Sequence, residues 1–148
     1  MRVLLDTNIL TRSFQDRHEQ HATAVEAVAV LRARGDELFV VPQVLFEFWV
    51  VATRPLGENG FGSTPQEAVA RLSELKRSFK LELDPPDLFA AWERLVAENE
   101  VSGKAAHDAR LVASVEKAGL EAILTFNVRH FARDRHVTVL APEELRSS

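Results

Sequence analysis

The chain of 148 residues contains no cysteine, which excludes disulfides and thiolate metal sites. Any metal must therefore be held by oxygen or imidazole ligands. No apolar stretch approaches the roughly 20 residues that span a bilayer, and the apolar run after Met1 is interrupted at Asp6. We therefore expect a soluble, cytosolic protein without a signal peptide or a membrane segment.

An excess of positive charge is also missing, since the formal net charge is −4. This argues against a protein that coats nucleic acid through general basicity. It does not exclude an enzyme that gathers carboxylates around a metal and holds phosphates with a few local Arg and Lys residues. Because 46% of the residues are hydrophobic, the chain can bury a full core, and we expect a single domain over residues 1–148.

Apolar runs alternate with helical patterns along the sequence. Strands are predicted at residues 3–5, 38–41, 81–83, 122–125 and 137–140, and helices at 20–34, 42–53 and 104–118, with further helices starting near Thr64 and Pro85. Three helices have expected buried stripes, which are Val25, Val28 and Leu31; Val69, Leu72 and Leu75; and Leu88, Trp92 and Leu95. Residues 6–8 are interpreted as a polar loop and residues 56–63 as the only glycine-rich loop.

This alternation predicts an α/β fold with a mostly parallel sheet and helices on both faces. Ligand sites in such sheets lie beyond the carboxyl ends of the strands. Three segments leave predicted strands at that edge, at residues 6–8, 42–43 and 125–127. Their polar side chains are therefore the first candidates for a functional site.

Three acidic residues stand at unusual positions. Asp6 ends the first apolar strand; taken alone, it fits a helix cap somewhat better than catalysis. Glu47 lies in a helix that is apolar on nearly all sides, where a buried carboxylate is costly unless it is paired or bound to a metal. An ion pair with Arg54, two turns along, is the alternative explanation for Glu47.

Asp108 falls on the same helical stripe as Leu111, Val112 and Val115. Its place in the first turn is favoured by the helix dipole, but that gain does not require an inward-facing side chain. His107 points about a quarter turn away and is interpreted as a surface or substrate residue. A divalent cation could compensate all three acids, and Mg²⁺ or Mn²⁺ prefers such oxygen ligands, whereas zinc is disfavoured by the lack of ligand spacing.

Four motifs together resemble the PIN domain, and in particular the VapC-type ribonuclease toxins of bacterial toxin–antitoxin pairs. The motifs are Leu5-Asp6-Thr7-Asn8-Ile9-Leu10, Glu47 in the helix after the second strand, Gly103-Lys104-Ala105-Ala106-His107-Asp108-Ala109, and Ile123-Leu124-Thr125-Phe126-Asn127. The resemblance covers essentially the whole chain. It implies a PIN-like three-layer sandwich with the acids clustered at one end of a parallel sheet.

The resemblance also implies roles for individual residues. Asp6 and Asp108 would be the principal ligands of Mg²⁺, for which Mn²⁺ substitutes, and Glu47 would bind the metal directly or orient a bound water. Thr125 and Asn127 would stand where the family has a Thr or Ser and a fourth acid. Many relatives have Asp at the position of Asn127, and related sequences often have Asp at the position of His130. These two departures put a fully occupied second metal site in doubt.

Other polar residues near the strand ends fit substrate handling. Thr7 and Asn8 can bind the Asp6 carboxylate or a phosphate. The candidates for contacts with the RNA backbone are Arg12, Lys104, Arg110 and Arg129, although each one alone fits a solvated surface residue better. Phe126 and Phe131 fit the core better than base stacking. The expected partners are an RNA substrate, a cognate antitoxin and a second copy of the chain in a homodimer.

Other functions compete with metal-dependent RNA cleavage. A catalytically silent PIN-like module that binds RNA or a protein is supported by Asn127. A haloacid-dehalogenase type of phosphoryl transfer also starts from a strand-end aspartate, but it needs a second one where Asn8 stands. A response-regulator receiver is disfavoured too, because the second predicted strand ends in Val41-Pro42.

Overall fold

The computed structural model describes residues 1–132, 134 and 137–146. Five parallel strands form one sheet in the order β3-β2-β1-β4-β5. The strands are β1 (Arg2–Leu5), β2 (Glu37–Val40), β3 (Lys80–Leu81), β4 (Ala122–Leu124) and β5 (Thr138–Leu140). The predicted parallel sheet is therefore confirmed, with each predicted strand present within one or two residues.

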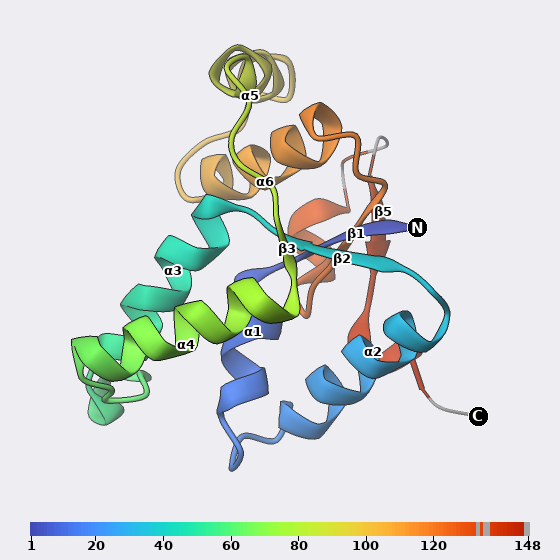
Figure 1. Ribbon diagram of the computed structural model, residues 1–148. Coiled ribbons are helices and arrows are strands. Elements are labelled where there is room, and N and C mark those ends of the chain that lie inside the picture. The colour runs from blue at the N-terminus through green and yellow to red at the C-terminus, as the bar shows by residue number, and fades with distance from the viewer. Residues whose placement is uncertain (133, 135–136, 147–148) are drawn as a thin grey trace.

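The helices connect these strands. They are α1 (Thr7–Phe14), α2 (His21–Ala33), α3 (Pro42–Thr53), α4 (Pro65–Ser78), α5 (Leu88–Glu98) and α6 (Ala105–Lys117), with short 3-10 turns η1 (Leu56–Glu58), η2 (Val128–Phe131) and η3 (Pro142–Glu144). Figure 1 shows α5 and α6 on one face of the sheet and α1 and α2 on the other, as a three-layer sandwich. Within the described part of the chain, every helix is too short or too polar to span a membrane.

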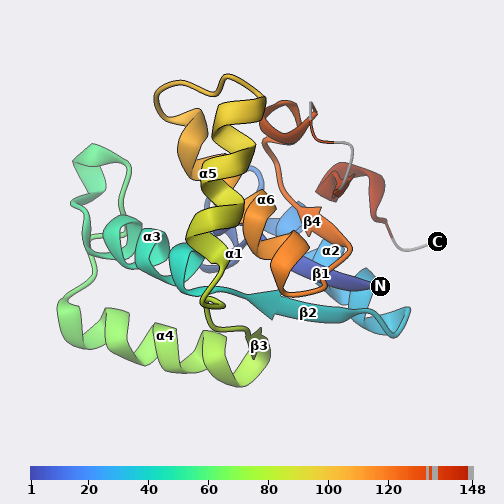
Figure 2. The ribbon, with the colours of Figure 1, turned by 90° about the horizontal axis from the view of Figure 1, so that it is seen from above.

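The apolar residues of the central strand β1, which are Val3, Leu4 and Leu5, are fully buried. Leu4 pairs in register with Phe39 on β2 and with Ile123 on β4, and each of these three side chains is at most 3% exposed. Continuous apolar runs are typical of parallel strands that are covered by helices on both faces. Because all strands point the same way, their carboxyl ends meet at one edge, beside α1, α3 and the start of α6 (Figure 2).

The structure corrects four expectations from the sequence. Residues 7–8 are the first turn of α1 rather than a loop, and Asp6 is the N-cap of that helix. Val25 and Val69 are half exposed, because α2 buries Ala24, Ala27 and Leu31 and α4 buries Ala68 and Leu75. Helix α3 is not buried on all sides, since Phe46 is 64% and Val50 is 53% exposed. Valine and alanine occur on several sides of α2 and α4, so the sequence alone does not show which side of each helix is buried.

Candidate active site

Asp6 stands where β1 ends and α1 begins. Its carboxylate accepts hydrogen bonds from the backbone N–H of Thr7 and the hydroxyl of Thr125, both at 2.7 Å, and from the Asn8 amide at 3.3 Å. The side chain is therefore both a helix cap and a fixed group at the mouth of the central strand. Capping explains its position. Oδ2 accepts both side-chain bonds and Oδ1 accepts only the cap bond, so Oδ1 keeps a lone pair for a further ligand.

The electrostatics of Asp6 are unusual for a surface cap. Burial raises its pKa from 3.8 to about 6, even though the hydrogen bonds from Thr125 and Thr7 act in the opposite direction. The nearby charges of Glu47 and Asp108 raise the pKa further. The protein thus holds a negative charge where both burial and like charges disfavour it, which is a common property of functional sites.

Glu47 faces Asp6 from α3. Its carboxylate accepts hydrogen bonds from the Thr7 hydroxyl and from the amide of Gln43, the latter at 3.1 Å. The alternative explanation is wrong, because Glu47 and Arg54 form no ion pair among the described residues. The Glu47 side chain is half-buried, so the full burial expected from the apolar sequence of α3 is wrong as well.

Asp108 approaches from the first turn of α6, with Leu111, Val112 and Val115 buried on the turns that follow. Its side chain is 28% exposed and lies 3.3 Å from Nδ1 of His130. Burial raises the pKa of Asp108, the nearby imidazole of His130 lowers it, and the charge of Glu47 raises it again. Asp108 therefore belongs to the same electrostatic cluster as Asp6 and Glu47.

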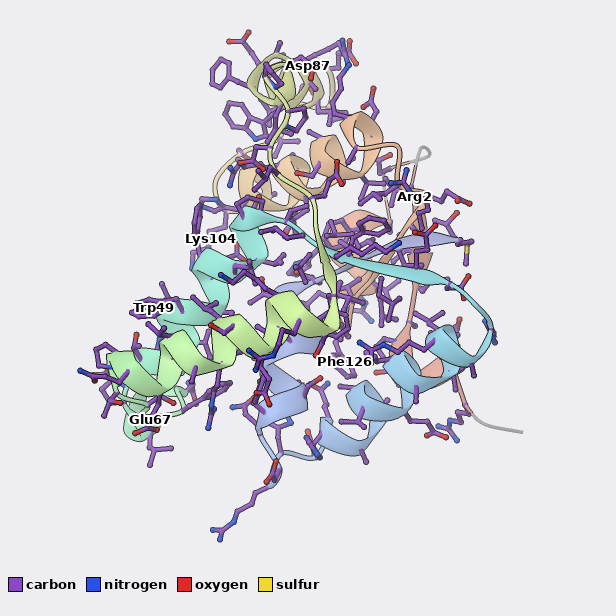
Figure 3. All side chains as sticks on the ribbon, in the orientation of Figure 1. Arg2, Trp49, Glu67, Asp87, Lys104 and Phe126 are labelled. Atoms are coloured by element: carbon purple, nitrogen blue, oxygen red, sulfur yellow. The ribbon has the colours of Figure 1, made fainter. Side chains whose placement is uncertain are left out.

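The three acids line one open hollow of about 850 Å³, which we call the acid hollow. Most predicted site residues border it, namely Asp6, Thr7, Asn8, Arg12, Glu47, Lys104, Asp108 and Asn127. Thr125 is fully buried behind Asp6 and acts through its hydroxyl. Lys104, at the start of α6, lies on the side of the molecule to which the strands point (Figure 3).

Two predicted substrate residues lie outside the acid hollow. Arg129 borders a neighbouring hollow that shares Lys104, Asp108 and His130 with it. Arg110 forms an ion pair with Asp84 at 2.9 Å and a weaker hydrogen bond with Gln43. Phe131 is buried in the core, and Phe126 packs against the core, as expected.

A network of hydrogen bonds joins the strand ends to α1. The Thr125 hydroxyl accepts from the backbone N–H of Asn127 at 2.9 Å while it donates to Asp6. The Asn8 side chain accepts from the backbone N–H of Phe126 at 3.2 Å. Thr125 and Asn8 therefore fix the Asp6 carboxylate from two directions, and Asn127 brings an uncharged amide to the edge of the hollow.

The donor set fits a hard divalent cation. The acids supply only oxygen atoms, and their mutual repulsion favours a positive charge between them. Across residues 1–132, 134 and 137–146, no three His, Asp or Glu side chains lie close enough to form a complete cluster around one ion. Mg²⁺ does not require such a cluster, because it is usually bound by one or two carboxylates and keeps several waters.

Gln43 lies in one of the three segments expected at the strand ends, but the sequence predicted no role for it. Gln43 is 5% exposed, and its amide donates to Glu47 and to the backbone carbonyl of His107, at 3.1 and 2.9 Å. It therefore ties α3 to the start of α6 beside the acids. The available signal was its position one turn before Glu47, as the only other polar residue in the first two turns of an apolar helix.

Comparisons with known proteins place the fold. The sequence profile of the PIN domain matches residues 3–135. No curated protein sequence gives a significant match. The structure is similar to a chain of the DNA-bound VapBC from Salmonella typhimurium, with a TM-score of 0.69 and 16% identity over 96% of this chain and 98% of that chain.

Two further solved structures are similar over most of the chain. VapBC2 from Rickettsia felis, bound to a promoter DNA fragment, gives a TM-score of 0.67 at 16% identity, covering 95% of this chain and 98% of that chain. VapC20 from Mycobacterium tuberculosis, a toxin that cleaves the sarcin–ricin loop, gives 0.64 at 24% identity, covering 88% and 93%. At these identities the likeness is one of fold.

Proposed function

Because the chain belongs to the PIN-domain family, we propose that it is a metal-dependent endoribonuclease and the toxin of a VapBC-type pair. The observation that carries this proposal is the convergence of Asp6, Glu47 and Asp108 on the acid hollow. The hollow is open and lined by polar side chains, as a binding site for a negatively charged RNA strand must be. Several structures of similar fold are toxins or toxin–antitoxin complexes, which supports the second part of the proposal.

Asp6 and Asp108 would hold Mg²⁺ or Mn²⁺, and Glu47 would bind the ion directly or through a water. When bound, such an ion polarises a phosphodiester and lowers the pKa of a water. Thr125 and Asn8 hold the Asp6 carboxylate in place, and Thr7 and Gln43 hold that of Glu47. Fixed donors of this kind avoid the cost of reorganising the site during the reaction. Asn127 contributes a neutral amide, which supports one strong metal site rather than two equal ones.

The substrate would be an RNA strand that crosses the acid hollow. Arg12 and Lys104 border the hollow and supply positive charge for backbone phosphates, and Thr7 and Asn8 lie beside the acids. Arg129 would contact RNA only where the strand leaves the hollow toward its neighbour. The chain can therefore hold RNA locally despite its net charge of −4.

The proposed protein partners are an antitoxin and a second copy of the chain. Apolar side chains on α3 support a protein interface, since Phe46 and Val50 lie one turn apart and are more than half exposed. Growth arrest on expression, relieved by co-expression of a small DNA-binding protein encoded directly upstream, would support the toxin assignment. Normal growth at high expression of folded protein would contradict it.

The nuclease proposal is tested with purified protein and a mixed-sequence RNA pool. We expect cleavage with Mg²⁺ or Mn²⁺ that stops on chelation, and a loss of at least 100-fold in Asp6→Asn and Asp108→Asn, the size typical of removing a group that stabilises the transition state. Glu74→Gln, an exposed acid on α4, is the matched control. A cleavage rate equal to that of the wild type in both aspartate variants would contradict the proposal. RNA binding without cleavage would favour the silent module, for which Asn127 is the supporting residue.

A further inference from the structure

The acid hollow extends well beyond the three acids. Its far part is bordered by the last turns of α1 and by the segment that follows α3, through Arg12, Gln15, Arg54 and Asn59. Arg12 is six residues from Asp6, and Arg54 is seven residues from Glu47. At 1.5 Å per residue, the backbone positions of the two arginines lie roughly 9–10.5 Å along their helices from those of the acids.

Arg12 is held in a fixed position by neutral groups. Its Nε donates to the Gln20 side chain at 3.0 Å, and its Nη1 donates to the Gln15 side chain at 2.6 Å. Among the described residues no carboxylate pairs with it, and burial lowers the pKa of the guanidinium. The Arg12 guanidinium is thus half-buried, held in place by two amides and not neutralised by a carboxylate. A cation in such a setting can bind an anionic ligand.

Arg54 adds a second positive charge at the same end. It is half-buried, and within the described ranges its guanidinium forms no ion pair or hydrogen bond with the protein. Its backbone carbonyl accepts from Gly62 at 2.8 Å, which holds the segment against the end of α3. The end of the hollow away from the acids is therefore cationic, whereas the centre is anionic.

We propose that Arg12 and Arg54 form a phosphate subsite that binds a second phosphodiester of the same RNA strand, within about three nucleotides of the bond that is cut. This inference rests on the proposed nuclease function. Successive phosphates of one strand are spaced about 3.4 Å along the axis of a stacked, B-form helix, so a separation of roughly 9–10.5 Å corresponds to about three phosphates. A guanidinium group can donate two parallel, charge-assisted hydrogen bonds to two oxygens of one phosphate.

Binding of a labelled 12-nucleotide RNA of mixed sequence tests the subsite, measured by fluorescence anisotropy in Ca²⁺ over a range of KCl. We expect Arg12→Gln and Arg54→Gln each to weaken binding about 10-fold at low salt, as for the loss of one charge-assisted contact. The slope of log K against log salt should fall by about 0.7 for one lost phosphate. Arg54→Gln is the cleaner variant, because Arg12 also holds Gln15 and Gln20.

Arg34→Gln is the matched control, since Arg34 is exposed and lies outside the acid hollow. Equal affinity and slope in wild type and Arg54→Gln would overturn the subsite, as would an equal loss in Arg34→Gln. Titration of inorganic phosphate into the wild type and Arg54→Gln distinguishes a site for free anions from a site for an RNA strand. If phosphate binding depends on Arg54 but RNA affinity does not, the subsite proposal is overturned. If the wild type binds RNA through Arg54 but cleaves none, the nuclease proposal fails, and Arg12 and Arg54 remain only as a phosphate site for a bound RNA strand.

Discussion

At the scale of single residues, the ionised carboxylate of Asp6 is stabilised by the hydrogen bonds that it accepts and destabilised by its burial. Three groups donate to its carboxylate, yet its pKa is raised to about 6. The charge therefore costs free energy of folding at neutral pH when no cation is bound. Such a cost is typical of residues that serve a ligand rather than the fold.

We predict that metal-free Asp6→Asn is more stable than the wild type at pH 7.5, by about 1–3 kcal/mol. The folded state favours the protonated acid, so the contribution of Asp6 to stability is fully present below pH 3.8 and is lost as the pH rises through about 6. Urea unfolding in EDTA between pH 4 and 8 measures the difference between the two proteins. A difference that stays constant across this range would contradict the prediction.

Gln43 gives a second prediction, because it holds Glu47 without facing the substrate itself. In Gln43→Leu the Glu47 carboxylate and the His107 carbonyl each lose a buried donor. We expect a loss of roughly 1–3 kcal/mol in stability. For RNA cleavage we expect kcat to fall about 10-fold with KM nearly unchanged, because the role is to orient a catalytic group.

The split between kcat and KM separates the two possible roles of Gln43. Rates are compared at a temperature at which both proteins are fully folded, as judged by circular dichroism. A lower melting temperature with an unchanged kcat would show that Gln43 only joins α3 to α6.

At the scale of elements, the loop after α3 holds one wall of the acid hollow. Gly60 is buried and its backbone N–H donates to Pro55, and Phe61 and Ser63 donate to carbonyls of the last turns of α3. A Cβ atom on Gly60 would lie 2.0 Å from the backbone oxygen of Arg54. The loop has no room for a side chain at this position, so the close approach explains the glycine.

Gly60→Ala is therefore expected to push the Arg54 backbone out of place. We predict a loss of about 1–3 kcal/mol in stability, as for an overpacked core, together with weaker binding of RNA. Gly57→Ala is the matched control from the same loop, because a Cβ there meets nothing within 4 Å. Thermal unfolding and RNA anisotropy measure both effects, and equal behaviour of the two alanine variants would show that the loop adapts freely.

The sequence predicted most helices and strands, but not which face of each helix is buried. Helix α3 has the predicted bounds 42–53, and α4 begins next to the predicted Thr64, whose hydroxyl accepts from the backbone N–H of Glu67. Helix α1 was missed because its first turn is polar, and these polar residues are the ones the site uses. Which face of α3 is covered depends on neighbours far along the chain, and the apolar pattern of one helix carries no information about them.

At the scale of the whole molecule, the parallel sheet explains why the site was predictable in part. Asp6 and Thr125 end adjacent strands, so strand order alone brings them together. Glu47 and Asp108 reach the same edge because α3 and α6 start there. The second partners of these acids, such as Gln43 and His130, depend on side-chain contacts between helices. Such contacts follow from tertiary packing and not from local sequence.

The same arrangement predicts that divalent metal stabilises the entire fold. A cation that binds only the folded protein adds about 2.7 kcal/mol at a hundred times its Kd, which corresponds to a rise of roughly 5–10 °C in Tm for a chain of this size. We expect this rise with Mn²⁺ or Mg²⁺ in the wild type and in Glu74→Gln, and its loss in Asp6→Asn and Asp108→Asn. Because unfolding is measured without RNA, the result does not depend on knowing the substrate. An equal rise in all four proteins would place the metal elsewhere and would exclude Asp6 and Asp108 as its ligands.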